Sequence, residues 1–332
     1  YYHNNPTVSI CWNRTAVYLL SILMLKFIKL IVRYSLIATL CVVVYNYSVD
    51  KVGVFWRGSA FGNYEPNQRY LKTKFLLENK NKFRTILAGS SRPGFISVSN
   101  HLDSSYNFSY SQGVPQETLE DLKFLYENGL KLDTVILAVD NISFMVDSRI
   151  HNSQPLRFGY TNQKEKIKLL FTPSKVISDL RSAISTKTKL YFINKDGSKR
   201  VIKEPNPEAI NWDIPSSGEY YSEDITSTKK AIKELKELCD INNTELIIFV
   251  NPLYKSTFLH YQREMEMFLD ELGDFNVYNF CHLNELTSSK ENYYETSHYR
   301  PHVGDTIMRV ILTNNTSSTY LKKPTNISAG GF

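Results

Sequence analysis

Three groups of polar residues stand beside apolar patterns in this 332-residue chain, where an enzyme could place reacting side chains. They are Gly89-Ser90-Ser91, Asp140-Asn141 and Glu295-Thr-Ser-His298. A serine hydroxyl becomes a nucleophile when a neighbouring base takes its proton, and that base must be held by a third group. A carboxylate three residues before a histidine in a turn can reach the histidine's other ring nitrogen. One serine of the Ser90-Ser91 pair, with His298 and Glu295, is therefore the candidate catalytic group.

The segments that must position these residues alternate between strand and helix patterns. Continuous apolar runs are typical of strands buried on both faces of a sheet, and weaker runs indicate two further strands. The expected strands cover 85–88, 105–110, 134–139, 246–250 and 276–280, and the first and last helices cover 67–78 and about 303–312. Strands that alternate with helices imply a parallel sheet covered on both sides. Ligands bind at the carboxyl ends of such strands, where all three polar groups are expected.

The stretch from about 150 to 225 breaks this alternation. It contains two basic helical patterns, 163–170 and 174–185, and then a hairpin from Lys189 to Lys203 that turns at Asp196-Gly197. A Pro- and Ser-rich loop follows. We interpret the stretch as an insertion over the catalytic face rather than as a separate domain.

Residues 1–49 have the pattern of a membrane anchor. Leu30 to Tyr47 is almost free of charge and nearly reaches the roughly 20 apolar residues that span a bilayer. Basic residues precede the charge-free part at Lys26, Lys29 and Arg33, so the positive-inside rule puts the N-terminus in the cytoplasm and the main domain outside it. No small-x-small cleavage site follows, which favours an uncleaved signal anchor over a cleaved signal peptide. A buried core helix is the third reading of the run.

The expected organisation has four parts. They are a cytoplasmic N-terminus with a transmembrane signal anchor (1–49), a juxtamembrane linker with the first helix (50–83), a catalytic domain (84–313) and a tail rich in Asn, Ser and Thr (314–332). We expect the tail to be disordered. The organisation predicts a single-pass membrane protein whose main domain is extracytoplasmic.

Composition narrows the function. Hydrophobic residues make up 42% of the chain, enough for a sizeable core, and the net charge of +6 comes from scattered Lys and Arg residues rather than a nucleic-acid-binding stripe. The four cysteines show no CxxC pairing and no histidine at metal-ligand spacing, so we expect no zinc site. Acyl transfer through a serine, a histidine and a carboxylate implies no metal or organic cofactor. Cys239 and Cys281 are expected to be buried free thiols, with a disulfide between them as the alternative.

Two of the motifs resemble those of the SGNH (GDSL-like) hydrolase and acyltransferase superfamily. Ile86 to Arg92 (ILAGSSR) resembles its first block, and Tyr293 to Ile307 (YYETSHYRPHVGDTI) resembles its last block, Asp-x-x-His followed by a helix. Gly-Ser-Ser in the first block is frequent in membrane-linked branches, among them alginate O-acetyltransferase-like proteins and the D-alanyl transfer protein of lipoteichoic acid synthesis. The resemblance implies Ser91 as nucleophile, His298 as base and Glu295 as the group that orients His298.

The resemblance also implies an oxyanion hole. Asn107 to Gly113 (NFSYSQG) looks like the second block, whose glycine amide would be that of Gly113, and Asn141 falls where the third block carries its asparagine. Together with the amide of Ser91, these groups would bind the oxyanion. Arg92, next to the nucleophile, is a candidate for binding an anionic substrate group, with a surface charge at a helix start as the alternative.

For the fold, the resemblance implies a flavodoxin-like three-layer α/β/α domain around a parallel sheet. For the function, it implies an esterase or O-acyltransferase acting on an acyl ester such as an O-acylated cell-surface glycan, with the membrane and a membrane acyl-transfer partner of unknown identity as partners. Two departures keep other functions open: the third block lacks Gly-x-Asn-Asp, and Glu295 stands where the family has aspartate. The alternatives are an inactive module that binds glycan or scaffolds a membrane assembly, and a lipase for small esters.

Overall fold

The computed structural model describes residues 14–50, 52–55, 66–173, 191–202, 204–216, 224–315 and 321. The chain divides into two units, Tyr1–Val49 with Ile167–Thr186 and Asp50–Lys166 with Lys187–Phe332. One long helix makes up most of the described part of the first unit, and the second unit contains the sheet and its flanking helices.

The helix of the first unit, α1 (Arg14–Val49), is 36 residues long. Its stretch Val17–Val49 contains a window of mean hydropathy 2.1, none of which is buried. By length and composition α1 can cross a membrane, as an anchor or as a signal sequence, whereas its exposure argues against a buried core helix. Near its end, Asn46 Nδ2 donates to the carbonyl oxygens of Leu170 and Thr172 at 2.9 and 3.2 Å, which joins the two segments of this unit.

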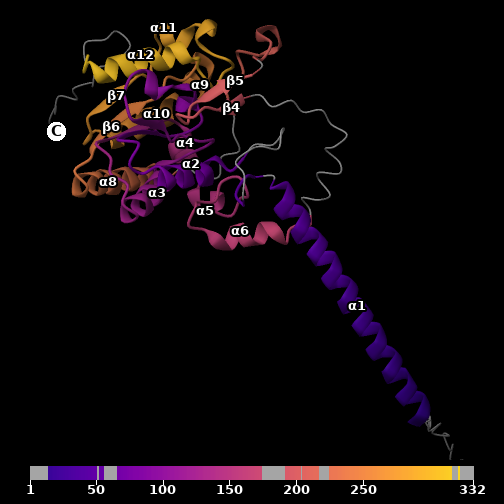
Figure 1. Ribbon diagram of the computed structural model, residues 1–332. Helices are drawn as coiled ribbons and strands as arrows, with labels where there is room; N and C mark the ends of the chain where they lie inside the picture. Colours follow the sequence, from indigo (N-terminus) through magenta and orange to yellow (C-terminus); the bar gives the residue numbers. More distant parts are fainter. Residues whose placement is uncertain are drawn as a thin grey trace, which may run out of the picture. The chain divides into compact units, whose positions relative to one another are not determined.

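The second unit is built on a sheet of five parallel strands. They are β1 (Thr85–Ala88), β2 (Ser105–Asn107), β3 (Thr134–Val139), β6 (Glu245–Val250) and β7 (Val277–Asn279). The strands lie in the order β2-β1-β3-β6-β7. Figure 1 labels β6 and β7 among the helices of this unit. Numbered among themselves, they follow the order 2-1-3-4-5 of flavodoxin-like folds. The predicted flavodoxin-like parallel sheet is therefore confirmed.

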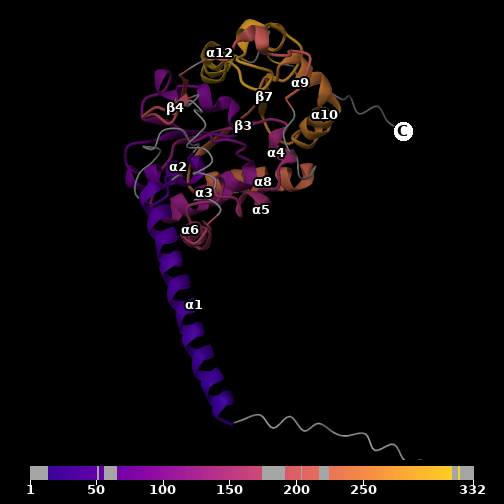
Figure 2. The ribbon, with the colours of Figure 1, turned by 90° about the vertical axis from the view of Figure 1, so that its right-hand side faces the viewer.

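The central strands are buried on both faces because successive side chains alternate between two cores. Ile86 and Leu137 belong to the core beneath α2 (Gln68–Glu78), α3 (Pro115–Glu127), α8 (Ile225–Ile241) and α10 (Gln262–Glu271). Leu87 and Ile136 belong to the other core, which α12 (Pro301–Leu312) covers. Figure 2 shows α3 and α8 on one side of the strands and α12 on the other. This is the expected three-layer arrangement.

Short helical segments make most of the remaining connections. They are the α-helices α4 (Ile142–Met145), α5 (Ser148–His151), α6 (Gln163–Leu170), α9 (Lys255–His260) and α11 (Glu285–Ser288), and the 3-10 turns η1 (Arg92–Phe95), η2 (Val98–Asn100), η3 (Pro207–Ala209) and η4 (Lys290–Asn292). Cys239 and Cys281 are buried and not joined in a disulfide, as predicted.

A hairpin in the 150–225 stretch is formed by β4 (Tyr191–Ile193) and β5 (Lys199–Val201), which pair antiparallel. It turns at Asp196-Gly197 as predicted, with Gly197 at φ +80°. The turn contacts the end of β2, where the Asn107 N–H donates to the Asp196 carbonyl at 2.7 Å. The buried Lys72 ammonium donates to the Gly197 carbonyl at 2.7 Å, and its burial lowers its pKa well below the usual value. The hairpin is thus joined to β2 by a backbone hydrogen bond and to α2 by the Lys72 side chain.

Some expectations differ from the structure or lie outside it. β2 ends at Asn107 rather than at Tyr110, although the Phe108 and Tyr110 N–H groups still donate to the Leu87 and Gly89 carbonyls at 2.7 and 3.2 Å. β7 is also shorter than expected and has a single strand neighbour. The helix expected at 174–185 and most of the tail 314–332 lie outside the described residues.

Candidate active site

The turn after β1 presents Ser91 at the edge of the sheet. Gly89 has φ +145°, and a Cβ on it would lie 2.6 Å from the Ala138 carbonyl oxygen of β3, so only glycine allows this close approach. Ser91 starts η1 without making a side-chain capping bond. Its hydroxyl oxygen instead lies 2.8 Å from Nε2 of His298, which is 207 residues away in the chain. The contact expected between the two residues is therefore present.

The loop that carries His298 is a tight turn closed by its own backbone and by Glu295. Tyr293 and Tyr299 form an antiparallel bridge across it, and the Tyr294 N–H donates to the His298 carbonyl at 2.9 Å. The Glu295 carboxylate accepts the backbone N–H groups of Ser297 and His298 at 2.7 and 3.0 Å. The same carboxylate is hydrogen-bonded to His298 Nδ1. The loop thus accommodates the extra methylene of glutamate.

The electrostatics of this loop favour an ionised Glu295. Burial by itself would raise the pKa of Glu295, but the hydrogen bond from His298, the Ser297 amide and the charge of Arg92 hold it below its usual value. A carboxylate facing Nδ1 holds the ring proton there, which leaves Nε2 as the acceptor for the Ser91 hydroxyl. The side chains of His298 and Glu295 are 29% and 35% exposed, so a substrate can reach the pair from solvent.

The position of the pair agrees with the topology of the sheet. β2 and β3 lie on opposite sides of β1, so the chain order reverses at β1 and β3. Ligands of open α/β sheets bind in the crevice that such a reversal leaves at the carboxyl ends of the strands. Ser91 follows β1 and Asp140 follows β3 at this edge.

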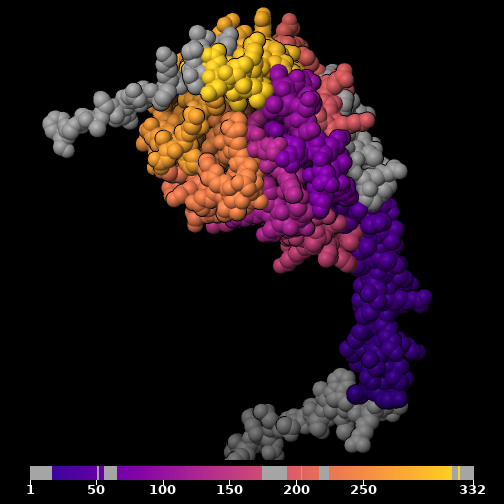
Figure 3. Space-filling model, turned by 60° about the vertical axis from the view of Figure 1, so that its left-hand side comes forward, coloured from indigo at the N-terminus to yellow at the C-terminus, as the bar shows by residue number. Residues whose placement is uncertain are grey.

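Helix α12 holds the segment after Ser91 in place from the other side. A Cβ on Gly304 would lie 2.6 Å from Ile96 Cγ1, so the helix and the end of η1 are in direct contact. Figure 3 shows the yellow segment near the C-terminus lying beside purple atoms of the first half of the chain. The segments that carry Ser91 and His298 are therefore packed together beyond their own hydrogen bond.

The predicted oxyanion donors other than Ser91 have partners of their own. The Gly113 N–H donates to the Tyr110 carbonyl at 3.0 Å, and a Cβ on Gly113 would lie 2.5 Å from the Gly89 carbonyl oxygen. Gly113 is thus next to the serine turn, but its amide is engaged in a turn. Asn141 is fully buried, with its side-chain nitrogen 3.9 Å from the Met145 sulfur. The oxyanion roles of Ser91, Gly113 and Asn141 stay predictions.

The prediction that Arg92 binds substrate is wrong. Arg92 is 1% exposed and forms an ion pair with the fully buried Asp140 at 2.8 Å. Its Nε also donates to the Ser297 carbonyl oxygen at 3.1 Å. The sequence pattern placed this charge on the surface because a Lys or Arg at a helix start is usually solvated; here the loops from three strand ends enclose it.

Sequence reasoning also missed Asn251 and Tyr299. The side-chain nitrogen of Asn251 donates to Asp140 at 3.0 Å, and the Tyr299 hydroxyl donates to Asn251 at 2.9 Å. One signal could have found Asn251, since it is the polar residue directly after the apolar strand 246–250, as Asp140 is after 134–139.

Aromatic side chains border the imidazole of His298. The Phe95 ring meets it edge-on with centroids 5.7 Å apart, and the Tyr294 ring lies 5.4 Å from that of Phe95. Arg300 lies over Tyr294 at 4.7 Å and pairs with Glu204 at 2.8 Å. Glu204 follows β5, so the 150–225 stretch reaches the His298 loop.

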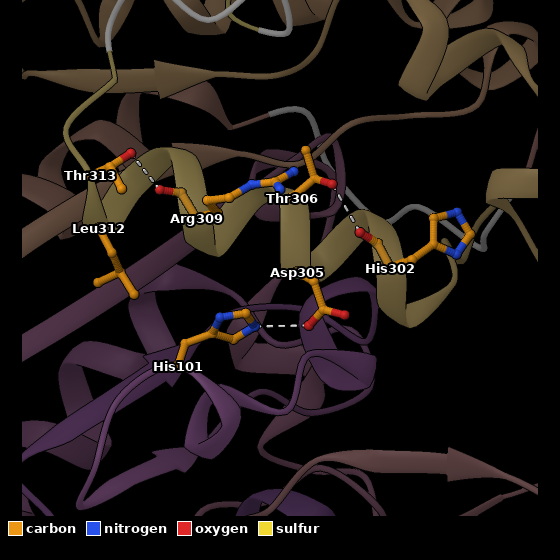
Figure 4. A pocket seen from close by; sticks show the side chains of 7 residues that line it. All are labelled: His101, His302, Asp305, Thr306, Arg309, Leu312 and Thr313. Carbon is orange, nitrogen blue, oxygen red and sulfur yellow. Dashed lines mark hydrogen bonds and ion pairs between the residues drawn. The ribbon is translucent and has the colours of Figure 1, made fainter.

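A hollow is lined by His101, which follows η2, and by residues of α12, and Ser91 is not among the residues that line it (Figure 4). His101 Nε2 lies 2.8 Å from Asp305 Oδ1 across it, and His302 Nε2 lies 2.9 Å from Asn292 Oδ1. These histidines join neighbouring segments. Among the described residues, no group of three or more His, Cys, Asp and Glu side chains could hold a metal ion.

No protein family model matches the chain, and no curated protein matches it. Among solved structures, the chain is similar to a GDSL-like lipase from Bacteroides thetaiotaomicron. The TM-score is 0.38 and the identity is 10%, over 75% of this chain and 97% of the lipase. A likeness this distant does not support a function for the chain.

Proposed function

We propose that this chain is a serine-dependent esterase or O-acyltransferase of the SGNH type. The observation that carries the proposal is the hydrogen-bonded series Ser91, His298 and Glu295 at the carboxyl edge of a flavodoxin-like sheet. Nucleophile, base and orienting carboxylate stand in the order that acyl transfer requires. Partial exposure of His298 and Glu295 gives a substrate access.

In the proposed reaction, the Ser91 oxygen attacks the acyl carbon while His298 Nε2 takes the hydroxyl proton. Glu295 holds the Nδ1 proton and stabilises the imidazolium. As the intermediate collapses, His298 returns the proton to the leaving alcohol, and the acyl group stays on Ser91. Water or a sugar hydroxyl then gives its proton to His298 as it attacks the acyl carbon. His298 passes that proton to the Ser91 oxygen as the bond between this oxygen and the acyl carbon breaks, which releases the acyl product and restores the Ser91 hydroxyl.

The proposed oxyanion donors are the amides of Ser91 and Gly113 and the side chain of Asn141. One such donor contributes about 3–4 kcal/mol to the transition state. The Gly113 amide would have to share its hydrogen with the Tyr110 carbonyl, which it already contacts at 3.0 Å. Asn141 would have to turn its amide from the Met145 sulfur.

We further propose that the chain acts outside the cytoplasm on an O-acylated cell-surface glycan, anchored by α1 and working with a membrane acyl-transfer partner. The support is the apolar helix α1, the basic residues Lys26, Lys29 and Arg33 within it, and the resemblance of the Gly-Ser-Ser motif to membrane-linked SGNH branches. A tag at the C-terminus should be accessible on spheroplasts. Protection of that tag from protease while the cells stay sealed would reverse the orientation.

The test of the chemistry uses a serine-directed phosphonate and an activated acetyl ester. The wild type should be labelled at Ser91 and should hydrolyse the ester, and Ser91→Ala should do neither. His298→Ala should lose activity on the order of 10²–10⁴-fold, while His302→Ala, a histidine four residues later, serves as the matched control and should stay active. If the wild type and the three variants all hydrolyse the ester at the same background rate and none is labelled, the alternative function, an inactive module that binds glycan or scaffolds a membrane assembly, is favoured.

Glu295→Asp distinguishes an active site whose loop has adjusted to glutamate from a site that lost its activity when aspartate was replaced. Glu295 reaches the imidazole and two backbone amides at once, and aspartate is one methylene too short to keep all three contacts. Ester hydrolysis should therefore fall in Glu295→Asp. An inert wild type combined with turnover by Glu295→Asp would indicate a decayed site instead.

A further inference from the structure

One buried side chain at the edge of the sheet, Asp140, collects contacts from three strand ends. It follows β3 and is fully buried. Its carboxylate accepts the Ser90 hydroxyl at 2.7 Å and the Asn251 side-chain N–H at 3.0 Å, and it pairs with the Arg92 guanidinium at 2.8 Å. The Ile142 N–H donates to the same carboxylate at 2.9 Å. Asp140 is therefore held from every side by charge or hydrogen bonds.

The contacts of Asp140 continue to the loop that carries the base. Arg92 Nε donates to the Ser297 carbonyl at 3.1 Å, and the Tyr299 hydroxyl donates to Asn251 at 2.9 Å. Ser90 and Arg92 are the residues on either side of Ser91. Ser297 and Tyr299 are the residues on either side of His298. A single buried network thus holds both neighbours of the nucleophile and both neighbours of the base.

We propose that Asp140 is the positioning residue that sets the distance between Ser91 and His298. This inference rests on the proposed function, because it assigns a role within the same reaction. Ser91 and His298 come from separate segments, 207 residues apart, so their 2.8 Å contact depends on how those segments are held. An ion pair in the dry interior resists displacement, because moving either charge from its partner leaves a buried charge uncompensated.

The chain contains a matched control for a merely structural role. Arg69 and Asp121 also form a buried ion pair at 2.8 Å, with side chains 1% and 5% exposed. This pair joins α2 to α3, and neither residue is next to Ser91 or His298 in the sequence. Asp121→Asn therefore perturbs a buried Arg–Asp pair without perturbing the neighbours of the candidate catalytic residues.

The first measurement compares Asp140→Asn with Asp121→Asn in the full chain. At a temperature where circular dichroism shows both folded, Asp140→Asn should lower kcat on the acetyl ester and the rate of phosphonate labelling on the order of 100-fold, the cost of a misplacement of about 1 Å. KM should change by less than about threefold, because substrate binding is left intact. Asp121→Asn should keep the wild-type rates per folded molecule. Full activity in folded Asp140→Asn would overturn the inference.

The second measurement does not need activity. With ¹⁵N-labelled histidine, the Nε2 signal of His298 should shift between wild type and Ser91→Ala, since the substitution removes its hydrogen-bond partner. In an Asp140→Asn background the same substitution should leave the signal unchanged, because the contact is already lost. The full wild-type shift in that background would also overturn the inference. A wild type that is not labelled but shows the predicted NMR behaviour would refute only the proposed function.

Discussion

Arg92 and Arg69 are both 1% exposed, and each pairs with an aspartate at 2.8 Å, yet the two regions around them differ in what they join. Arg92 connects the loops after β1 and β3 with the His298 loop, all at the carboxyl edge of the sheet. Arg69 connects helices on one face of the sheet. A buried Arg–Asp pair thus positions Ser91 and His298 in one region, and in the other it holds α2 against α3.

The Arg69 region also has a different charge balance. Glu117 and Glu120 lie 3.3 and 2.8 Å from the guanidinium in addition to Asp121, and His151 Nδ1 lies 3.1 Å from Glu117. Burial alone would lower the pKa of Arg69, but the charges of Asp121 and Glu117 raise it well above the usual value. Three carboxylates share one cation there, whereas Arg92 and Asp140 pair one to one. The simpler pair, Arg92 with Asp140, is the one that lies beside the candidate catalytic residues.

Removal of either cation should have the largest effect on stability. Arg92→Met and Arg69→Met each leave buried carboxylates uncompensated, so each should lower the free energy of unfolding by about 3–5 kcal/mol. Per folded molecule, Arg92→Met should lose ester hydrolysis and Arg69→Met should keep it. Urea unfolding and assays corrected for the folded fraction measure both effects.

A double variant, Arg92→Met with Asp140→Leu, is the control for charge. Replacing both partners by apolar residues should recover much of the stability that either single change loses. Activity should stay low, because the hydrogen bonds to Ser90, Ser297 and Asn251 are gone. Recovery of activity along with stability would show that burial of charge, rather than positioning, explains the loss.

A second pair of changes compares two glycines with positive φ. Gly89→Ala, in the serine turn, should cost on the order of 3 kcal/mol or more, because φ is +145° and the new Cβ would lie 2.6 Å from the Ala138 oxygen. Gly129→Ala, after α3, has φ +87° and meets only Lys80 Nζ at 3.5 Å, so about 1–2 kcal/mol is expected. Equal losses on thermal unfolding would contradict the crowding inferred between β1 and β3.

Acid titration should separate the two regions by the sign of the effect. The pKa of Glu295 is below its usual value, so its contribution to stability is present above pH 4.5 and is lost as the pH falls through the folded value. Burial, with Glu117 and Glu120 nearby, raises the pKa of Asp121 from 3.8 to about 6, so its contribution is lost as the pH rises through that range. Between pH 3 and 7, the free energy of unfolding should rise with pH through the contribution of Glu295 and fall with pH through that of Asp121. Measured by chemical unfolding, Glu295→Gln should remove the first dependence and Asp121→Asn the second.

The smallest effect is expected at the hollow of Figure 4. His101 and Asp305 are 20% and 50% exposed, and such pairs contribute about 0.2–1 kcal/mol. His101→Gln should lower the Tm slightly and leave ester hydrolysis unchanged. A large loss of activity in this variant would mean that the hollow belongs to the site.

The sequence by itself determined the features that depend on neighbouring residues. Apolar runs such as 85–88 and 134–139 predicted buried strands, since the side-chain period of a strand is local. The Asp196-Gly197 turn followed from backbone conformations open to glycine. The spacing of Glu295 and His298 within one turn likewise predicted a contact that lies inside that turn.

Only the tertiary structure decided the roles of Arg92, Asp140, Asn251 and Tyr299. Their contacts join segments 48 to 205 residues apart, such as Tyr299 with Asn251 and Arg92 with Ser297. No local pattern states which strand ends become neighbours, because that depends on the order of strands in the folded sheet. From sequence alone, a charged side chain such as Arg92 is therefore predicted to be solvated, because its partner of opposite charge comes from a distant segment that only the folded sheet places beside it.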